Sequence, residues 1–237
     1  MNIILFDSDS ESQALPKSDL RAQHILKVLK CNLGDTFHAG VINGSFGQGT
    51  LTAINDKELV FHFTWTKEQQ TVDDIQFIIG LPRPQTARKI LNTLSTLGAS
   101  AIHFVQTDKS DKNYTSSKLW STDEWSRHLI DGAQQAFTTT IPKVHWDQSL
   151  YKTVKALPTD TTKIALDNYE GSSTLGHTEI KLPLIVAIGP EQGWSDKDRD
   201  ILRRHGFHLA HLGTRVLRVE TACVSTLSII KSKLGLM

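Results

Sequence analysis

The sequence contains few cysteines and no long apolar run, and both absences narrow the classes of protein that it can encode. Cys31 and Cys223 are the only cysteines among 237 residues, too few for a disulfide framework or a cysteine-based metal site. No apolar stretch approaches the roughly 18 residues of a membrane span. The N-terminus also lacks a basic leader followed by an apolar segment. We therefore expect a cytoplasmic protein with no membrane segment and no metal.

An excess of charge of either sign is also absent. The chain has 26 Lys and Arg against 25 Asp and Glu, a formal net charge of +1. This balance argues against a protein that binds nucleic acid through its overall charge. Local clustering matters more, because five arginines fall within twenty residues: Arg199, Arg203, Arg204, Arg215 and Arg218. The cluster predicts a basic face, and a solvated helix surface is an equally good interpretation of Arg199, Arg203 and Arg204.

The C-terminal part contains two glycine-bearing turns, each between a buried strand and a helix. The first follows the apolar run 182–188, which is typical of a strand covered on both faces of a parallel sheet. After this turn, Ser195 and Asp198 have the spacing of a capping box and predict a helix from Asp196 to His205. A short strand over 207–212 leads to the second turn.

A last helix follows the second turn and places Cys223, Leu227, Ile230 and Leu234 on one apolar stripe. Because open α/β sheets bind ligands where strands end, function is expected at the two turns. Neither turn carries a G-x-x-x-x-G-K-[ST] or G-x-G-x-x-G pattern, which excludes the common nucleotide-phosphate cradles.

The chain divides into two parts at a polar stretch near residue 70. Short predicted strands at 3–6, 36–42, 49–54 and 58–63, with one helix after Asp19, indicate a small barrel in residues 1–68. Residues 72–237 alternate strands and helices, which is typical of a parallel sheet. Strands are expected at 75–80, 101–106 and 163–167, with a helix at 122–137 begun by a Ser121/Glu124 capping box.

The two turns carry residues that identify a family. Gly189-Pro190-Glu191-x-Gly193, followed by Leu212-Gly213-x-Arg215-Val216-Leu217-Arg218-x-Glu220-Thr221-Ala222, resembles the RsmE family of the SPOUT superfamily. Those enzymes methylate N3 of a uridine in 16S ribosomal RNA. The resemblance implies an α/β methyltransferase domain at 72–237 with a deep C-terminal trefoil knot. It further implies a PUA-like RNA-binding β-barrel domain at 1–68, a homodimer, and S-adenosylmethionine as the methyl donor.

The resemblance also assigns roles to residues. Arg218 is expected to hold the uridine and stabilise its charge, although a phosphate or carboxylate clamp is an equal alternative. Glu220 would orient Arg218, accept a hydrogen bond from the donor's amino group or, with Thr221, cap the last helix. The expected donor-binding residues are Leu166, Gly189, Pro190, Glu191, Gly193, Leu212, Gly213, Val216, Leu217, Thr221 and Ala222. The expected RNA-binding residues are Arg199, Arg203, Arg215, Lys27 and Lys30.

Several positions depart from the family pattern. Gln192 replaces a glycine, Thr93 to Gly98 replaces Lys-Ala-Thr-Glu-Leu-Gly, and an arginine expected after Gln134 to Thr138 is absent. The arginine-rich N-terminus of the family is also missing. The departures fall on RNA-facing or site-organising positions and spare the donor loops. They leave two alternatives open: a methyltransferase for another rRNA or tRNA nucleotide, or a silent paralogue that binds RNA or ribosomal particles.

Overall fold

The chain folds into two compact units. The computed structural model describes residues 3–66 and 71–237. The first unit comprises residues 1–71 together with 133–141, and the second comprises 72–132 and 142–237. A division into residues 1–68 and 72–237 therefore omits a segment that returns to the first unit. Part of the predicted polar linker, residues 67–70, lies outside the described residues.

The first unit is a curled, mixed five-stranded sheet with one helix. Its strand order is β1-β3-β4-β5-β2, with β1 parallel to β3 and the other pairs antiparallel. β1 and β2 are the edge strands, so the predicted barrel is an open half-barrel. The elements are β1 (Ile4–Phe6), β2 (Ser12–Pro16), α1 (Leu20–Lys27), β3 (Thr36–Val41), β4 (Phe46–Ile54) and β5 (Glu58–Trp65).

Aromatic packing and the returning segment hold the first unit together. Phe6, Phe37, Phe61 and Phe63 are buried and meet largely edge to face, with the Phe6 and Phe63 ring centroids 4.7 Å apart. From the returning segment, the Thr139 hydroxyl donates to the Gly44 carbonyl over 2.8 Å. The Thr139 carbonyl accepts from the Asn43 N–H over 2.7 Å. These bonds explain why residues 133–141 belong with this sheet.

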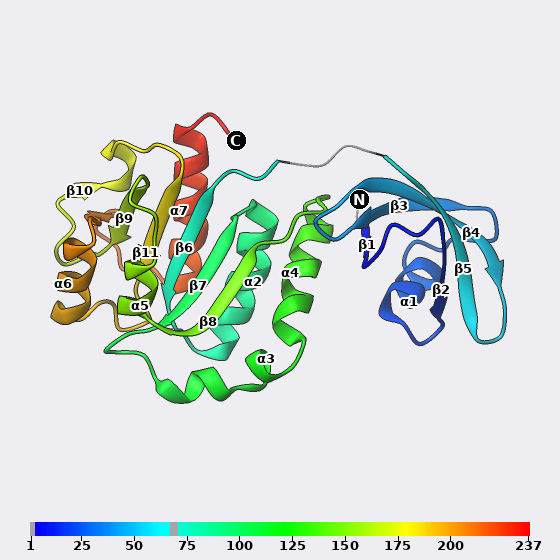
Figure 1. Cartoon of the computed structure of the whole chain (residues 1–237), viewed down its shortest axis with the longest axis horizontal. Helices are drawn as coiled ribbons and strands as arrows, with labels where there is room; N and C mark the ends of the chain where they lie inside the picture. Colours follow the sequence, from blue (N-terminus) through cyan, green and yellow to red (C-terminus); the bar gives the residue numbers. More distant parts are fainter. Residues whose placement is uncertain (1–2, 67–70) are drawn as a thin grey trace. The chain divides into compact units, whose positions relative to one another are not determined.

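The second unit is built on a seven-stranded parallel sheet of order β10-β12-β9-β11-β6-β7-β8. Figure 1 shows its helices and strands in sequence colours. The strands are β6 (Ile75–Gly80), β7 (Ala101–Gln106), β8 (Lys143–Ser149), β9 (Thr162–Leu166), β10 (Ser173–Thr174), β11 (Leu184–Ile188) and β12 (His208–His211). The helices are α2 (Pro84–Leu97), η1 (Lys112–Ser116), α3 (Lys118–Ser121), α4 (Glu124–Gln135), α5 (Leu150–Lys155), η2 (Leu175–His177), α6 (Asp196–Arg204) and α7 (Val219–Lys233).

Helices cover both faces of this sheet, as a near-continuous apolar β11 requires. Ile78, Ile185 and Ala187 point into a core shared with α5 and α6, which contact each other. The opposite face meets α7, which contacts β11 and packs against α2. Figure 1 shows α5 near α6 and α2 near α7. Cys223 is fully buried on α7, so its predicted role as a small apolar core residue is confirmed.

Local capping signals succeed at α6 and fail at α4. The Ser195 side chain accepts from the Asp198 N–H while the Asp198 carboxylate accepts from the Ser195 N–H, which confirms the capping box. At α4 the expected capping box is wrong, because Ser121 is the last residue of the short helix α3. Instead the Thr122 hydroxyl accepts from the Glu124 N–H. The Glu124 carboxylate pairs with Arg88 of α2, so a tertiary ion pair replaces the local cap.

Two kinds of feature are absent from the part of the chain that the structure describes. No helix within 3–66 and 71–237 is long and apolar enough to cross a membrane. In the same ranges, no three His, Cys, Asp or Glu side chains gather in a way that could hold a metal ion. The trefoil knot stays a prediction.

A partly buried histidine predicts loss of stability in acid. Burial lowers the pKa of His103 on β7 to about 4, and the charge of the stacked His145 adds to this effect. A histidine in the unfolded chain has a pKa near 6.5. Between pH 6.5 and 4 the unfolded chain therefore binds a proton at this position and the folded chain does not. The contribution of neutral His103 to stability is therefore complete above the unfolded pKa and declines below it. At pH 5 the loss amounts to about 2 kcal/mol.

Urea unfolding at pH 7 and pH 5 tests this expectation. The His103→Phe variant should lose less stability than the wild type between the two pH values. An identical loss in both proteins would assign the acid sensitivity to other groups.

Candidate functional site

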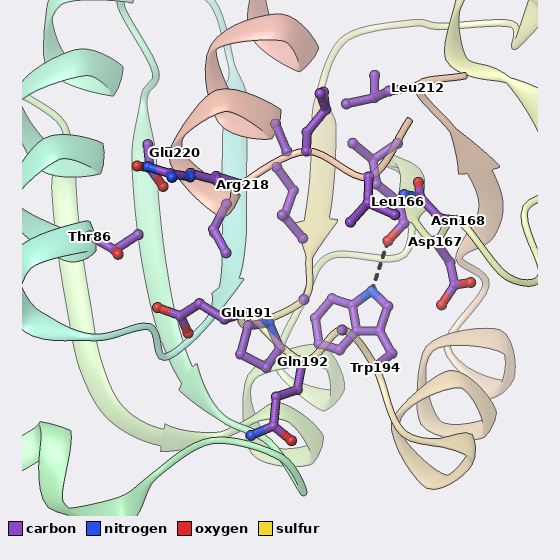
Figure 2. A pocket seen from close by; sticks show the side chains of 18 of the residues that line it. Thr86, Leu166, Asp167, Asn168, Glu191, Gln192, Trp194, Leu212, Arg218 and Glu220 are labelled. Carbon is purple, nitrogen blue, oxygen red and sulfur yellow. Dashed lines mark hydrogen bonds between the residues drawn. The ribbon is translucent and has the colours of Figure 1, made fainter. Parts of the chain in front are cut away.

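A cavity of about 720 Å³ lies at the carboxyl ends of the central strands of the second unit. Its walls come from the residues that follow β9, β11 and β12 and from the N-terminal turns of α2 and α7, as Figure 2 shows. The lining residues are Arg83, Gln85, Thr86, Lys89, Leu166, Asp167, Asn168, Tyr169, Ile188, Gly189, Pro190, Glu191, Gln192, Gly193, Trp194, Leu212, Val216, Leu217, Arg218, Val219, Glu220 and Ala222. This is the edge at which a parallel α/β sheet places its ligand site.

The structure gathers most of the predicted site residues around this cavity. Every predicted donor-binding residue lines it except Gly213 and Thr221, and Arg218 and Glu220 line it as well. Thr221 is exposed on the first turn of α7. Gly213 has φ +118°, and its N–H donates to His211 Nδ1, so it shapes the second turn from outside the cavity.

Close backbone packing explains the glycines of the first turn. A Cβ on Gly189 would lie 3.0 Å from the Gly193 backbone, and a Cβ on Gly80 at the end of β6 would lie 2.6 Å from the Pro190 nitrogen. Gly193 itself has φ +66°, the left-handed region that favours glycine. The turn therefore packs against β6 and doubles back on itself, which brings its backbone to the cavity wall.

Trp194 anchors this turn, and the sequence analysis did not single it out. The indole is 1% exposed, and its Nε1 donates to the Leu166 carbonyl over 3.0 Å, the dashed line in Figure 2. Lys109 Nζ donates to the carbonyls of Gln192 and Trp194 over 3.3 and 3.1 Å. The Trp194 bond ties the turn after β11 to the end of β9, and the Lys109 bonds tie it to the segment after β7. The sequence feature that could have indicated this anchor is a tryptophan directly after a glycine-bearing turn.

Removing the indole N–H should loosen the turn. We expect Trp194→Phe to lower the free energy of unfolding by about 1–3 kcal/mol, because the Leu166 carbonyl loses a buried donor. Trp120→Phe is the matched control, since the buried Trp120 Nε1 has no hydrogen-bond partner among the described residues. Urea unfolding of both variants measures the difference. Equal losses would show that the Trp194 hydrogen bond contributes nothing.

Arg199 is buried, so the interpretation of a solvated helix face is wrong for this residue. Its predicted role in RNA binding stays a prediction. Arg199 is 6% exposed, and its Nε donates to Asp167 Oδ2 over 2.8 Å. Its Nη1 donates to Asp196 Oδ1 over 2.9 Å. Burial alone would lower the pKa of Arg199, but the hydrogen bond and charge of Asp167, with Glu170 and Asp196, raise it. The interpretation of a solvated face was wrong because periodicity could not show that α6 turns this side toward the buried carboxylate of Asp167.

Asp167 uses its other oxygen to shape the loop after β9. Asp167 Oδ1 accepts from the N–H groups of Tyr169 and Glu170 over 2.7 and 2.8 Å. The Arg199 guanidinium lies 5.6 Å from the centre of the Tyr169 ring. Asp167 and Arg199 together therefore fix the loop that carries Asn168 and Tyr169 on the cavity wall.

The other predicted RNA-binding residues remain on the surface. Arg203 is about half exposed and pairs with Glu170. Arg215 is exposed and does not line the cavity. Lys27 and Lys30 are exposed on the first unit, where Lys27 Nζ lies 3.5 Å from Gln23 Oε1. Their role in RNA binding stays a prediction.

A carboxylate with two cations lies where α2 meets α7. Glu220 Oε1 is 3.2 Å from Lys89 Nζ, and Arg218 precedes Glu220 by two residues. Partial burial by itself would raise the pKa of Glu220, but its own backbone N–H, Lys89 and Arg218 lower it overall. Glu220 is thus a stable carboxylate and a weak base. Figure 2 shows Arg218 and Glu220 on the side of the cavity where Thr86 lies.

Glu191 links the first turn to α2. Its Oε1 accepts from the Arg83 N–H over 3.0 Å, and Arg83 is the N-cap residue of α2 with no side-chain cap of its own. The carboxylate thus satisfies a backbone donor at a helix start. The arrangement places β11, α2 and α7 around one opening, with positively charged side chains at its rim.

Comparisons with known proteins agree with this arrangement of fold and cavity. Residues 68–231 match the RNA methyltransferase domain family. The chain is 32% identical to Ribosomal RNA small subunit methyltransferase E of Treponema pallidum over 97% of this chain and 90% of that protein. It is 28% identical to Ribosomal RNA small subunit methyltransferase E 1 of Borreliella burgdorferi, with 99% of both chains covered.

A solved structure shares the fold. The ribosomal RNA small subunit methyltransferase E from Neisseria gonorrhoeae, crystallised bound to S-adenosyl methionine, superposes with a TM-score of 0.80. It is 20% identical and covers 98% of each chain. The family match, on a chain with this α/β fold, defines an RNA methyltransferase. Within that class, the chain belongs to the ribosomal RNA small subunit methyltransferase E family, RsmE.

Proposed function

We propose that this enzyme transfers a methyl group from S-adenosylmethionine to N3 of a uridine in 16S ribosomal RNA. It acts as a homodimer in the cytoplasm. The observation that carries the proposal is the cavity formed by the three strand ends, with Arg218 on its rim. The names of the relatives support a small-subunit ribosomal RNA substrate.

The chain's residues fit a bent, partly apolar donor. Leu166, Ile188, Leu212 and Leu217 give the cavity apolar walls suited to an adenine ring. The glycine turn exposes backbone amides and carbonyls that can bind its polar edge. The cavity volume of about 720 Å³ lies within the range of small-molecule sites.

The donor, when bound, supplies a methyl group on a positively charged sulfur and departs as a neutral thioether. The chain's own residues must hold the acceptor nitrogen in line with the methyl group. Uridine N3 carries a proton at neutral pH, so a negative charge develops on the ring as that proton leaves to water. Arg218 is exposed at the rim and can place its guanidinium against that charge. Because the pKa of Glu220 is lowered, it suits a charge-orienting role better than that of a proton acceptor.

The RNA would be held by exposed cations of both units. Arg203 and Arg215 are candidates on the second unit, and Lys27 and Lys30 on the first, the proposed PUA-like RNA-binding domain. The target uridine must be unpaired or flipped out, because pairing buries N3.

Methyl transfer in vitro tests the proposal. Purified protein is mixed with isotope-labelled S-adenosylmethionine and either naked 16S rRNA or small ribosomal subunits lacking the modification. Label is expected in one N3-methyluridine after digestion and mass spectrometry. Label in another rRNA or tRNA nucleotide would support the alternative substrate. A protein that neither binds S-adenosylmethionine nor methylates any RNA would support the interpretation of a silent paralogue.

A further inference from the structure

Lys89 occupies the cavity beside the proposed catalytic arginine. Its side chain is 61% exposed and its Nζ lies 3.2 Å from Glu220 Oε1, whose side chain is only 19% exposed. Both residues line the cavity. Lys89 lies outside the two glycine-bearing turns, in the second turn of α2.

Helix packing determines where this cation lies. α2 and α7 contact each other, and Glu220 is in the first turn of α7. The Lys89 ammonium is therefore drawn to a carboxylate at the N-terminus of α7, next to Arg218. Glu220 also lies where the helix dipole favours negative charge.

The charges around this spot leave an excess of positive charge. The charged lining residues are Arg83, Lys89, Arg218, Glu191, Glu220 and Asp167. Asp167 is neutralised by buried Arg199, which is outside this set. The remaining three cations face two carboxylates, and Glu191 is hydrogen-bonded to the start of α2. The opening between α2 and α7 is thus suited to an anionic oxygen.

We propose that Lys89 is a second cation for the acceptor, donating a hydrogen bond to a carbonyl oxygen of the target base as its N3 proton leaves. This inference rests on the proposed function. The N3 proton goes to water, the bond from N3 to the methyl carbon forms, and the bond from sulfur to that carbon breaks. Lys89 keeps its protons throughout, while Glu220 holds its ammonium in place.

The test compares Lys89→Met and Lys89→Arg in single-turnover methyl transfer at saturating donor and RNA. Lys152→Met is the control, because Lys152 is an exposed lysine of α5 that does not line the cavity. We expect Lys89→Met to slow methyl transfer roughly 100-fold, the lower end of the effect of losing one donor to a developing anion. Lys89→Arg should recover most of the rate, and Lys152→Met should keep the wild-type rate.

The pH profile provides a readout that a structural role would not move. Without Lys89 the anion of the target base is less stable. The rising limb of the pH–rate profile should therefore shift to higher pH, by about one pH unit for each tenfold loss of rate. Donor affinity by calorimetry should stay within about twofold of wild type. Wild-type protein that transfers no methyl group would remove the proposed function itself, separately from this inference.

Three outcomes would overturn the role of Lys89. An unchanged rate and pH profile in Lys89→Met would exclude it from the reaction. Weaker RNA binding with a smaller salt dependence and an unchanged saturated rate would assign Lys89 to an RNA phosphate. Weaker donor binding alone would assign it to the donor's carboxylate.

Discussion

Replacing Arg218 by alanine is expected to lower the single-turnover rate of methyl transfer by about 10²–10³-fold. The side chain is exposed at the cavity rim and makes no cap to α7, so it is free to contact the acceptor. Losing one preorganised cation removes charge stabilisation that matters only in the transition state. The apolar walls and glycine turns remain, so donor affinity should be nearly unchanged.

Rapid-quench kinetics and calorimetry separate these two effects. Arg204→Ala is the matched control, because Arg204 is exposed on α6 and does not line the cavity. It should react at the wild-type rate. An Arg218→Ala enzyme with full turnover would remove the arginine from the chemistry. If Arg218→Ala instead weakened donor binding and kept the wild-type rate, Arg218 would be assigned to binding the donor.

Replacing Arg199 by alanine is expected to lower the free energy of unfolding by about 3–5 kcal/mol. Asp167 would then stay buried with its Oδ2 unpaired, since its side chain is only 2% exposed. The loop that presents Asn168 and Tyr169 to the cavity would lose its anchor. Donor affinity should therefore fall together with stability.

Urea unfolding measures this loss. Arg203→Ala is the control on the same helix, because its pair with Glu170 is solvent-exposed and worth about 0–1 kcal/mol. Arg199→Lys should restore only part of the stability, since one ammonium cannot reproduce the directed bonds to Asp167 and Asp196. A loss below about 1 kcal/mol in Arg199→Ala would show that Asp167 is compensated from elsewhere.

Local patterns were sufficient for much of the fold. The apolar run before Gly189 predicted β11, and the Ser195/Asp198 spacing predicted α6 with its capping box. The apolar stripe after the second turn predicted α7, which buries Cys223, Leu227 and Ile230. Each of these features depends on residues within a few positions of one another, and such short-range signals can be recognised in a sequence. The two spaced glycine motifs likewise located the cavity.

Long-range contacts account for what the sequence did not predict. Arg199 is buried because Asp167, far away in the sequence, lies beneath α6. Residues 133–141 join the first sheet through bonds to Asn43 and Gly44. Lys89 meets Glu220 because α2 packs against α7. The sequence spacing of these pairs gives no indication that their members are in contact.

Mass-spectrometric mapping of modified nucleosides in 16S rRNA, from cells with and without this gene, tests the proposed methyl transfer most directly. One N3-methyluridine is expected to disappear when the gene is removed. Wild-type protein should restore it, and Arg218→Ala should not. An rRNA modification profile that is identical with and without the gene would contradict the proposed substrate.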